Sequence, residues 1–579
     1  MITLDIESEA IVEFAPLLPR PVGIAIRWEG GISEYLSFGH PTNNNTDWDY
    51  ARKVLLSVWD KEILTHNGAT FDIPILQHYF YLPERNPLLT HDTLFLSYLH
   101  DPHANNLSLK DLAKVWLDWP PEEQEELHRW IMANTECKTK SKAGAYICKA
   151  PGDLVGKYAI GDVDRTFALY EHLVKIGTLE AMREPYEREL RLAPILSEVQ
   201  NFGVRVDVER LANDTTTAMG VLNELDAQVR KKLNAPDLSI DSNDSLVAAL
   251  QSSGYTNFLT TPTGKLSAGK ASIDQALEQD PELAELLHKR ATYATLTSTF
   301  MRPYLEITEA NGGRLHAAYN QVRNPDGYGT RTGRLSSSKP NFQNLPGDLG
   351  HQYPLIRSYI LPEEGHVWVT GDFKNQEPRL AAHFEDGALC EAFNRDPNLD
   401  PYLFTAEASG GITRKQAKVG FLGLLYAMGA KALAAGLGET EQLATIIRNC
   451  IKAAFPGLVA LDTDCKSRFR RGLPIRTLGG RYYHCEPPKN GRSFEYKALN
   501  ILIQGSASDQ TKEAIIYLKG KLLPGERILS TVHDEISVSC TEARVEAVKQ
   551  AMSEAANELP CDVPMLMDFG QGKNWAEAK

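Results

Sequence analysis

The chain has 579 residues, with 61 lysines and arginines against 75 aspartates and glutamates, and a formal net charge of −14. This length is too great for one hydrophobic core and predicts about three or four domains. The negative charge argues against non-specific coating of nucleic acid, but it is compatible with a basic cleft on an acidic body.

The eight cysteines are scattered and include no CxxC pair, so neither a zinc site nor a disulfide framework is indicated. The sequence starts directly with a strand-like segment, MITLDIES, which predicts no signal peptide. The longest apolar stretch, residues 419–430, is too short and too rich in glycine to span a bilayer. We therefore expect a cytoplasmic protein that makes no membrane contact.

Residues 1 to about 175 have the pattern of an α/β domain. Apolar and polar residues alternate from position 2 to position 7, so Asp5 and Glu7 are predicted on the same face of one strand. Two further strand patterns, 22–26 and 35–38, follow with turn residues between them, as in a meander.

Further acidic residues follow in predicted helices. Asp72 stands near the start of one helix, after an Asn-Gly turn that contains Asn67. Residues 157–170 have helical periodicity, which places Tyr158 and Asp162 one turn apart on one face. Together with the strand acids, these carboxylates could surround a pair of Mg²⁺ ions, which prefer carboxylate oxygens.

Any one of these acids could be an ordinary surface carboxylate, but the order of the motifs is distinctive. DIE, then N-x₃-FD, then Y-x₃-D, resembles the DEDD exonuclease family in its tyrosine-containing version, which has an RNase H-like fold. The resemblance implies that Tyr158 orients the attacking water and that Asn67 contacts the substrate strand. It implies four metal ligands: Asp5, Glu7, Asp72 and Asp162.

Residues from about 176 to 315 are mostly helical by pattern, with amphipathic stretches at 187–200 and 211–233. A strand is predicted in GRLHAAYNQ, and a basic loop, TRTGRLSSSKPNFQNLP, follows it and contains Arg334. The mixture of cations with Ser and Asn suits phosphate and base-edge contacts. This sequence motif resembles that of family A DNA polymerases, in which the preceding helical region is the thumb.

The segment VWVTGDFKNQEPRL, residues 367–380, predicts a short strand that Gly371 ends, followed by Asp372. Asn375 is a suitable helix N-cap, and Glu377 falls in the first turn of the next helix. A carboxylate beside a helix N-terminus suits a metal that receives phosphates. A solvated aspartate at a turn is the alternative reading of this segment taken alone.

Four residues recur at four-residue spacing between Thr413 and Gly429, so that they share one helical face: Arg414, Lys418, Leu422 and Tyr426. Cations suit a triphosphate, and an aromatic ring offers a surface on which a base can stack. The pattern resembles the fingers helix of family A polymerases, R-x₃-K-x₃-[FY]-G-x₂-Y-G. Leu422 and Ala427 depart from it, and Tyr402 stands where relatives commonly carry a histidine.

Two later motifs complete the resemblance. NILIQGSASDQ resembles the template-binding helix of the family, so Asn500 and Gln504 are expected to contact the minor groove, where base pairs present similar acceptors. ILSTVHDEISV predicts strand, turn and strand, with His533, Asp534 and Glu535 in the turn. This is the family's VHDE motif, which implies a second metal-binding carboxylate, Asp534, and a DNA contact at His533.

The resemblance implies an α/β multidomain protein in which an RNase H-like exonuclease domain precedes a right-hand polymerase domain. The expected division is 1–175 exonuclease, 176–315 thumb, 316–399 first part of the palm, 400–485 fingers and 486–579 second part of the palm. The resemblance implies that Asp372, Asp534 and the Phe373 carbonyl bind metal. It implies that Arg414 and Lys418 bind the triphosphate and that Glu377 excludes ribonucleotides. Leu422 and Tyr426 are also expected to contact the dNTP, and Arg334 is expected to contact the DNA.

The implied activity is DNA-directed DNA synthesis from a primer 3′-OH by two-metal phosphoryl transfer, with 3′–5′ proofreading, in viral DNA replication. Two Mg²⁺ ions are expected in each active site, with Mn²⁺ as a substitute. The expected partners of a monomer are primer-template DNA, dNTPs and replisome proteins such as a helicase-primase and a single-strand-binding protein. The alternatives are a 3′–5′ exonuclease of repair with an inactive polymerase half, and a non-enzymatic clamp.

Overall fold

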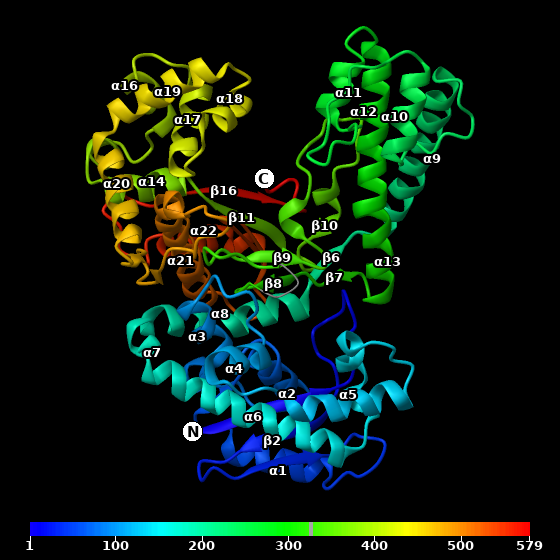
Figure 1. The fold of residues 1–579 in the computed structure, drawn as a ribbon, viewed down its shortest axis with the longest axis vertical. Coiled ribbons are helices and arrows are strands. Elements are labelled where there is room, and N and C mark those ends of the chain that lie inside the picture. The colour runs from blue at the N-terminus through cyan, green and yellow to red at the C-terminus, as the bar shows by residue number, and fades with distance from the viewer. Residues whose placement is uncertain (324–327) are drawn as a thin grey trace. The chain divides into compact units, whose positions relative to one another are not determined.

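The computed structural model describes residues 1–323 and 328–579, which fall into two compact units (Figure 1). Unit 1 comprises Met1–Gly203, His316–Gln343 and Gly365–Gln571, and unit 2 comprises Val204–Leu315, Asn344–Glu364 and Gly572–Lys579. These structural units cut across the five functional segments expected from the sequence, and that functional division remains a prediction.

A five-stranded sheet forms the N-terminal part of unit 1, in the order β3-β2-β1-β4-β5. Its strands are β1 (Ile2–Ser8), β2 (Pro21–Arg27), β3 (Ser33–Ser37), β4 (Ile63–Thr65) and β5 (Thr90–Asp92). The antiparallel meander β1-β2-β3 is confirmed, and β4 and β5 add to β1 in parallel. β1 is the central strand, and most of its side chains are buried.

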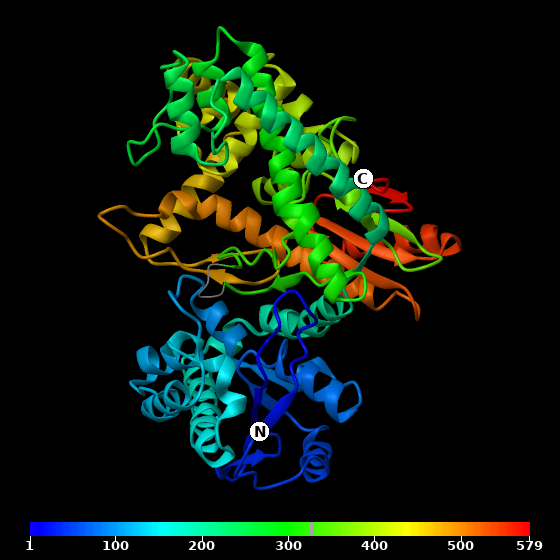
Figure 2. The same cartoon turned by 90° about the vertical axis from the view of Figure 1, so that its right-hand side faces the viewer.

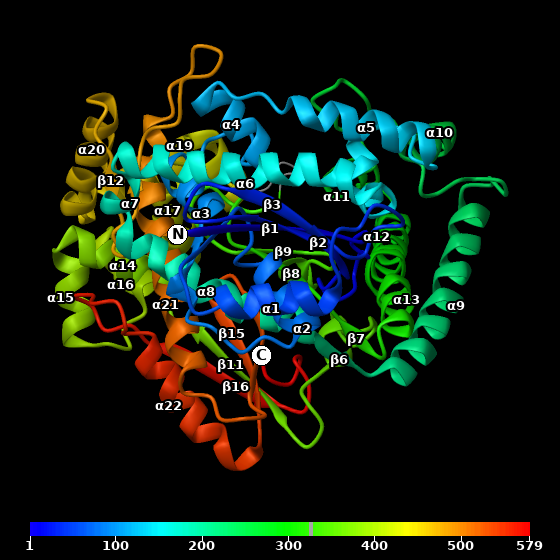
Figure 3. The ribbon, with the colours of Figure 1, turned by 90° about the horizontal axis from the view of Figure 1, so that it is seen from below.

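Helices cover both faces of this sheet (Figure 3). α1 (Trp48–Val58) and α2 (Asp72–Phe80) pack on the side chains of Ile2, Leu4 and Ile6. α6 (Gly152–Lys175) packs on the other face. The remaining helices of this region are α3 (Thr93–His100), α4 (Leu109–Leu117), α5 (Glu122–Asn134), the 3₁₀ helix η2 (Lys140–Lys149) and α7 (Thr178–Ala181).

A second sheet of unit 1 has the order β14-β15-β11-β16. Its strands are β14 (Arg527–Val532), β15 (Glu535–Cys540), β11 (Val367–Phe373) and β16 (Met567–Gly572). The prediction that Gly371 ends its strand is wrong, because Gly371 pairs with Ile536 inside the ladder. A Cβ at Gly371 would lie 2.8 Å from the Met552 sulfur of α22 (Val545–Ala555), so glycine here permits close packing of that helix.

A helical subdomain stands between β11 and β14 in the chain. It contains α14 (Gln376–Glu385), α15 (Ala388–Arg395), α16 (Pro401–Ala408), α17 (Arg414–Leu425), α18 (Ala430–Leu437), α19 (Glu441–Ala454) and α20 (Pro456–Arg470), then the short hairpin β12 (Ile475–Arg476) and β13 (Tyr482–Tyr483) and the long helix α21 (Ala498–Lys519). α17 and α19 meet closely at Gly420, whose added Cβ would lie 2.4 Å from Ile451 Cδ1. Among the described residues, no single helix meets the length and hydropathy of a membrane span, and only α19 with α20, bent by 97°, does so as a pair.

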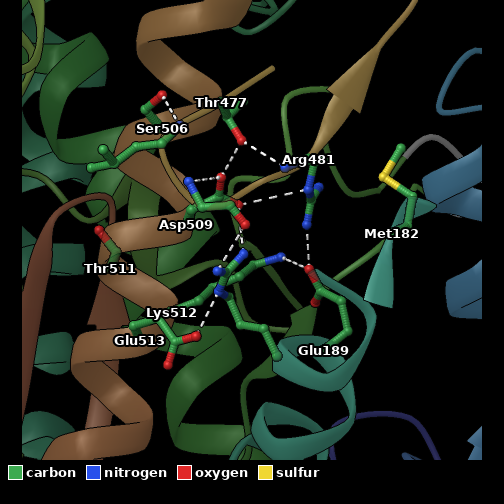
Figure 4. Close-up of polar contacts among 12 residues, drawn as sticks. Met182, Glu189, Thr477, Arg481, Ser506, Asp509, Thr511, Lys512 and Glu513 are labelled. Carbon is green, nitrogen blue, oxygen red and sulfur yellow. Dashed lines mark hydrogen bonds and ion pairs between the residues drawn. The ribbon is translucent and has the colours of Figure 1, made fainter. Parts of the chain in front are cut away.

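Buried ion pairs tie α21 to α8 (Arg183–Phe202) (Figure 4). Glu189 of α8 is fully buried and accepts hydrogen bonds from Lys512 Nζ at 2.6 Å and from Arg481. Asp509, also on α21, accepts a hydrogen bond from the Thr477 hydroxyl beside the β12-β13 hairpin. Buried charges of this kind are tolerated only when they are paired, so the network fixes α21 relative to α8.

Unit 2 is mainly helical (Figure 2). α12 (Pro281–Thr295), the π-helical turn η3 (Leu296–Met301) and α13 (Arg302–Ala310) follow one another directly and pack against α9 (Val208–Lys232). α10 (Asn243–Ser252) and α11 (Lys270–Ala276) complete its apolar core, and a small sheet has the order β10-β6-β7, formed by β10 (Ile360–Leu361), β6 (Val204–Val206) and β7 (Arg314–Leu315).

The strand predicted in GRLHAAYNQ is split into β7 and β8 (Ala318–Asn320), and β8 pairs with β9 (Ser336–Ser338). β8 and β9 belong to unit 1.

Candidate active sites

Carboxylates from three elements meet at the N-terminal sheet. Asp5 and Glu7 project from one face of β1, and a carboxylate oxygen of each lies within 4.8 Å of one from Asp162 in α6. Asp72 begins α2, and its Oδ1 accepts a hydrogen bond from the Ile6 backbone N–H at 2.9 Å. That bond fixes the start of α2 against β1, so all four acids predicted from the sequence belong to this region.

Burial and mutual repulsion disfavour the charged forms of these acids. Burial, with Asp72 and Glu7 nearby, raises the pKa of Asp5 well above its usual value. Burial, with Asp162 nearby, raises the pKa of Glu7 to about 8, and burial raises that of Asp72 to about 7. Such a concentration of acid is stabilised by a divalent cation.

The oxygens of Asp162 also fit a metal. Its Oδ1 is buried and accepts no hydrogen bond within the described part of the chain, and the Arg165 guanidinium lies 3.7 Å away. Buried oxygens are normally satisfied, so an orphaned carboxylate oxygen within a cluster of acids is a candidate metal ligand. The residues present therefore fit a divalent metal held by carboxylates.

Two partners of this cluster were not predicted from the sequence. The Lys110 ammonium of α4 donates hydrogen bonds to the Tyr158 hydroxyl at 2.6 Å and to Asp162 Oδ2 at 2.7 Å. Glu123, from the acidic first turn of α5, accepts a hydrogen bond at 2.9 Å from the fully buried Arg165. No local motif marks Lys110 or Glu123, because their partners lie more than 40 residues away in the chain.

Asn67 lies at the Asn-Gly turn after β4, with a left-handed φ of 68°. Its backbone N–H donates to Asp92 Oδ1 at 2.9 Å, and its side-chain oxygen accepts from the Thr70 hydroxyl at 3.0 Å. The residue is exposed and lines a cavity of about 250 Å³ in unit 1. A molecule that enters this cavity can therefore reach the Asn67 amide.

A second pair of carboxylates lies at the β14-β15-β11-β16 sheet: Asp372 is in β11, and Asp534 is in the turn between β14 and β15. Asp372 in β11 pairs in register with Glu535, and the Phe373 backbone N–H donates to the Asp534 carbonyl at 3.3 Å. His533 makes the preceding turn with a left-handed φ of 59°. Glu535, predicted in the turn, is the first residue of β15, because it continues the ladder to β11.

Asp534 is half-buried, and its surroundings oppose ionisation. Burial raises the pKa of its carboxyl, and Glu377 adds repulsion, while Arg334 and His533 partly offset it. Asp372 lines a cavity of about 410 Å³ that Arg414 also lines. The cavity thus joins an acid of the sheet to a cation of the helical subdomain.

Glu377 joins three separate segments. One carboxylate oxygen accepts a hydrogen bond from Arg334 of the TGRLSS loop, and the other accepts from the Tyr426 hydroxyl at 2.6 Å. The Glu377 side chain is 9% exposed. Asn375 precedes α14, but the prediction that its side chain caps the helix is wrong: its φ is 54° and it makes no capping hydrogen bond.

The expected face of α17 is present. Arg414 and Lys418 each lie 5.6 Å from the centroid of the Tyr402 ring, and Arg414 Nε donates to Asp400 Oδ2 at 2.8 Å. Leu422 is partly buried against the apolar core, and Tyr426 is the C-cap residue. The Tyr402 ring therefore stabilises both cations by cation–π contact, and Asp400 is a partner that no sequence pattern indicated.

Asn500 and Gln504 are the two half-buried positions in the first turns of α21, where residues 498–508 are otherwise buried. Their four-residue spacing places both amides on one face. Burial and the hydrogen bond to Glu377 raise the pKa of Tyr426, and Gln504 hydrogen-bonds the same hydroxyl and opposes that shift. The α21 amides therefore adjoin the Glu377 cluster.

Two family models match the chain. The model described as DNA polymerase family A matches residues 208–577, and the model described as 3′-5′ exonuclease matches residues 12–178. The second match begins after β1, so the placement of Asp5 and Glu7 rests on the geometry of the site.

Curated relatives are DNA polymerases. The chain is 27% identical to DNA polymerase I of Pseudomonas aeruginosa over 96% of its length, and it spans only 62% of that relative. It is 30% identical to DNA polymerase DpoZ of Vibrio phage phiVC8, with 74% of this chain and 72% of that one covered.

The fold also matches a solved structure, the POL domain of Pol1 from M. smegmatis in complex with DNA primer-template and dNTP. The TM-score is 0.79 at 21% identity, and the match covers 100% of this chain and 96% of the other. At this identity the similarity establishes the shared fold.

Proposed function

Because the chain belongs to DNA polymerase family A, we propose that it extends a primer 3′-OH with dNTPs on a DNA template and removes mispaired 3′ ends with its own 3′–5′ exonuclease. Asp372 in β11 and Asp534 in the adjoining turn between β14 and β15 carry this proposal, together with the cavity that Asp372 and Arg414 line. Acids opposite a cation suit a site that binds a metal-bound triphosphate.

In the polymerase site, each side chain has a separate task. Asp372, Asp534 and the Phe373 carbonyl would hold two Mg²⁺ ions, which supply charge neutralisation at the triphosphate and make the primer hydroxyl a better nucleophile. Arg414 and Lys418 grip the triphosphate, and Lys418 donates a proton to the departing pyrophosphate. Mn²⁺ is the expected substitute.

The sugar and base are selected by neighbouring residues. Glu377, held by Arg334 and Tyr426, blocks the space that a ribose 2′-OH would need. The Tyr426 ring lies beside the nascent pair, and Leu422 meets the incoming sugar where relatives present an aromatic ring. Arg334, Asn500, Gln504 and His533 contact the primer-template, the amides from the minor groove.

In the exonuclease site, Asp5, Glu7, Asp72 and Asp162 would hold two Mg²⁺ ions, which supply an activated water and neutralise the leaving oxygen. Tyr158 orients the attacking water, and Asn67 holds the substrate strand. The metal fit rests on the clustered oxygens and on the unsatisfied Asp162 Oδ1.

The functional domains that we propose are 1–175 exonuclease, 176–315 thumb, 316–399 palm, 400–485 fingers and 486–579 palm again. We propose that the protein acts as a monomer in viral DNA replication in the host cytoplasm, with replisome proteins such as a helicase-primase and a single-strand-binding protein.

Primer extension and primer degradation test the proposal separately. Asp372→Ala and Asp534→Ala are expected to abolish extension and leave degradation intact, whereas the double variant Asp5→Ala, Glu7→Ala should do the reverse. Asp464→Ala, an exposed acid on α20, is the matched control. Full extension by either polymerase-site variant would contradict the metal assignment, and degradation without any extension by the unaltered chain would favour a repair exonuclease with an inactive polymerase half.

A further inference from the structure

Lys110 reaches the N-terminal carboxylate cluster from α4, which carries none of its acids. Its ammonium donates to the Tyr158 hydroxyl and to Asp162 Oδ2, at 2.6 and 2.7 Å, and lies 4.0 Å from the centroid of the Tyr158 ring. Only 18% of its side chain is exposed. Ordering a lysine side chain costs conformational entropy, so charge-assisted contacts must hold it in place.

The contact to Asp162 gives the two oxygens of that carboxylate different surroundings. Oδ2 is taken by Lys110, whereas Oδ1 is buried without a hydrogen bond in the described structure. A carboxylate held at one oxygen cannot rotate freely about its terminal bond. Lys110 therefore leaves Oδ1 as the oxygen that a metal can use.

The contact to Tyr158 sets the direction of its proton. An ammonium can only donate, so the Tyr158 oxygen acts as acceptor and its own O–H must point toward another group. Donation from a cation also polarises that O–H and makes it a stronger donor. Asp162 is one such acceptor in the structure, and at a nuclease site the attacking water and the oxygens of the scissile phosphate are further ones.

We propose that Lys110 is a positioning residue of the exonuclease, which acts through Tyr158 by holding its hydroxyl as a donor toward the reacting groups. This inference rests on the proposed exonuclease function. The bond broken is the 3′-terminal phosphodiester: the water oxygen attacks phosphorus, the 3′ oxygen of the penultimate nucleotide leaves, and a nucleoside monophosphate is released. Lys110 neither gains nor loses a proton in this step.

Single-turnover removal of the terminal nucleotide from a single-stranded oligonucleotide, by the full-length chain, tests the inference. Lys110→Met is expected to lower the rate by about 10- to 100-fold, the range found when partners of metal-site groups are removed, with unchanged KM for the oligonucleotide. Lys110→Arg should recover much of the rate, since a cation is restored. Lys114→Met, an exposed lysine one turn along α4, is the matched control and should behave as the unaltered chain.

A mutant cycle with Tyr158→Phe identifies the route of action. If Lys110 acts through Tyr158, the double variant should be no slower than the slower single variant. Fully multiplicative losses would overturn the inference, and so would a Lys110→Met variant that retains the full rate. If the unaltered chain degrades no oligonucleotide at all, the proposed exonuclease function itself fails.

Metal binding separates positioning from simple structural support. Mn²⁺ titration followed by electron paramagnetic resonance should show that Lys110→Met binds Mn²⁺ at least as tightly as the unaltered chain, because a neighbouring cation has been removed and the oxygens remain. Loss of Mn²⁺ binding in that variant would mean that the carboxylate cluster had collapsed and would overturn the inference.

Discussion

Tyr426→Phe isolates the contribution of one hydroxyl to sugar selection. The hydroxyl donates to Glu377 at 2.6 Å, and a hydrogen bond to a charged group contributes about 1.5–3 kcal/mol. Since 1.36 kcal/mol is a factor of ten, complete loss of this bond would reduce the selection of dNTP over rNTP by about 10- to 150-fold. Arg334 still holds the other carboxylate oxygen, so we expect a loss near the lower limit.

The assay is the ratio of kcat/KM for a dNTP to that for the matching rNTP on one primer-template. Tyr426→Phe should reduce this ratio about tenfold, mainly by faster ribonucleotide incorporation. Tyr517→Phe is the matched control, because the Tyr517 hydroxyl donates to Glu554 at 2.8 Å in an exposed pair. An unchanged ratio in Tyr426→Phe would refute the reasoning that the hydroxyl holds Glu377 in the position that excludes a ribose 2′-OH.

Three further predictions concern stability, sugar recognition and metal binding. Glu189→Gln removes the acid that Lys512 and Arg481 share, although Asp509 remains 3.7 Å from Arg481, and should lower the free energy of unfolding in urea by about 3–5 kcal/mol. Leu422→Tyr should raise dideoxy relative to deoxy incorporation severalfold, about the effect of one hydrogen bond, because a phenol can replace the contact of the missing 3′-OH. The Mg²⁺ concentration for half-maximal exonuclease rate should rise as pH falls below about 8, since protons compete for Glu7, whose pKa is raised to about 8.

Each of these predictions has a specific control. Glu187→Gln, on the same helix as Glu189, should leave unfolding unchanged, because residues 1–323 and 328–579 provide Glu187 with no buried ion-pair partner. Leu422→Phe adds a ring without a hydroxyl and should not match the effect of tyrosine. Equal Mg²⁺ requirements at pH 6.5 and pH 8.5 would contradict the pKa argument.

Short-range patterns predicted the elements that carry the two sites. Alternation in β1 placed Asp5 and Glu7 on one face, and four-residue spacing placed Arg414 and Lys418 together on α17. Both patterns follow from the geometry of one strand or one helix. The strand, turn and strand around Asp534 is local for the same reason.

Long-range partners could not be predicted in this way. Lys110 and Asp162 are 52 residues apart, and Glu189 and Lys512 are 323 residues apart, so neither pair leaves a periodic trace in the sequence. The prediction that Gly371 ends its strand is wrong: glycine often ends a strand, whereas here the close packing of Met552 requires it. Asn375 was misread because a favoured capping residue can also adopt a left-handed conformation.

The two sites use a tyrosine hydroxyl in opposite ways, and the difference follows from the partner. Tyr426 donates to a carboxylate, so its proton is committed and its hydroxyl holds Glu377 in place. Tyr158 accepts from an ammonium and hydrogen-bonds Asp162, a proposed metal ligand, so in our proposal its proton faces the reacting groups. A synthetic site must exclude one sugar by shape, whereas a hydrolytic site must direct a water. Reversing the charge of Glu377 beside Tyr426, or of Lys110 beside Tyr158, is therefore expected to impair sugar selection or nucleotide removal, respectively, even though the tyrosine ring stays in place.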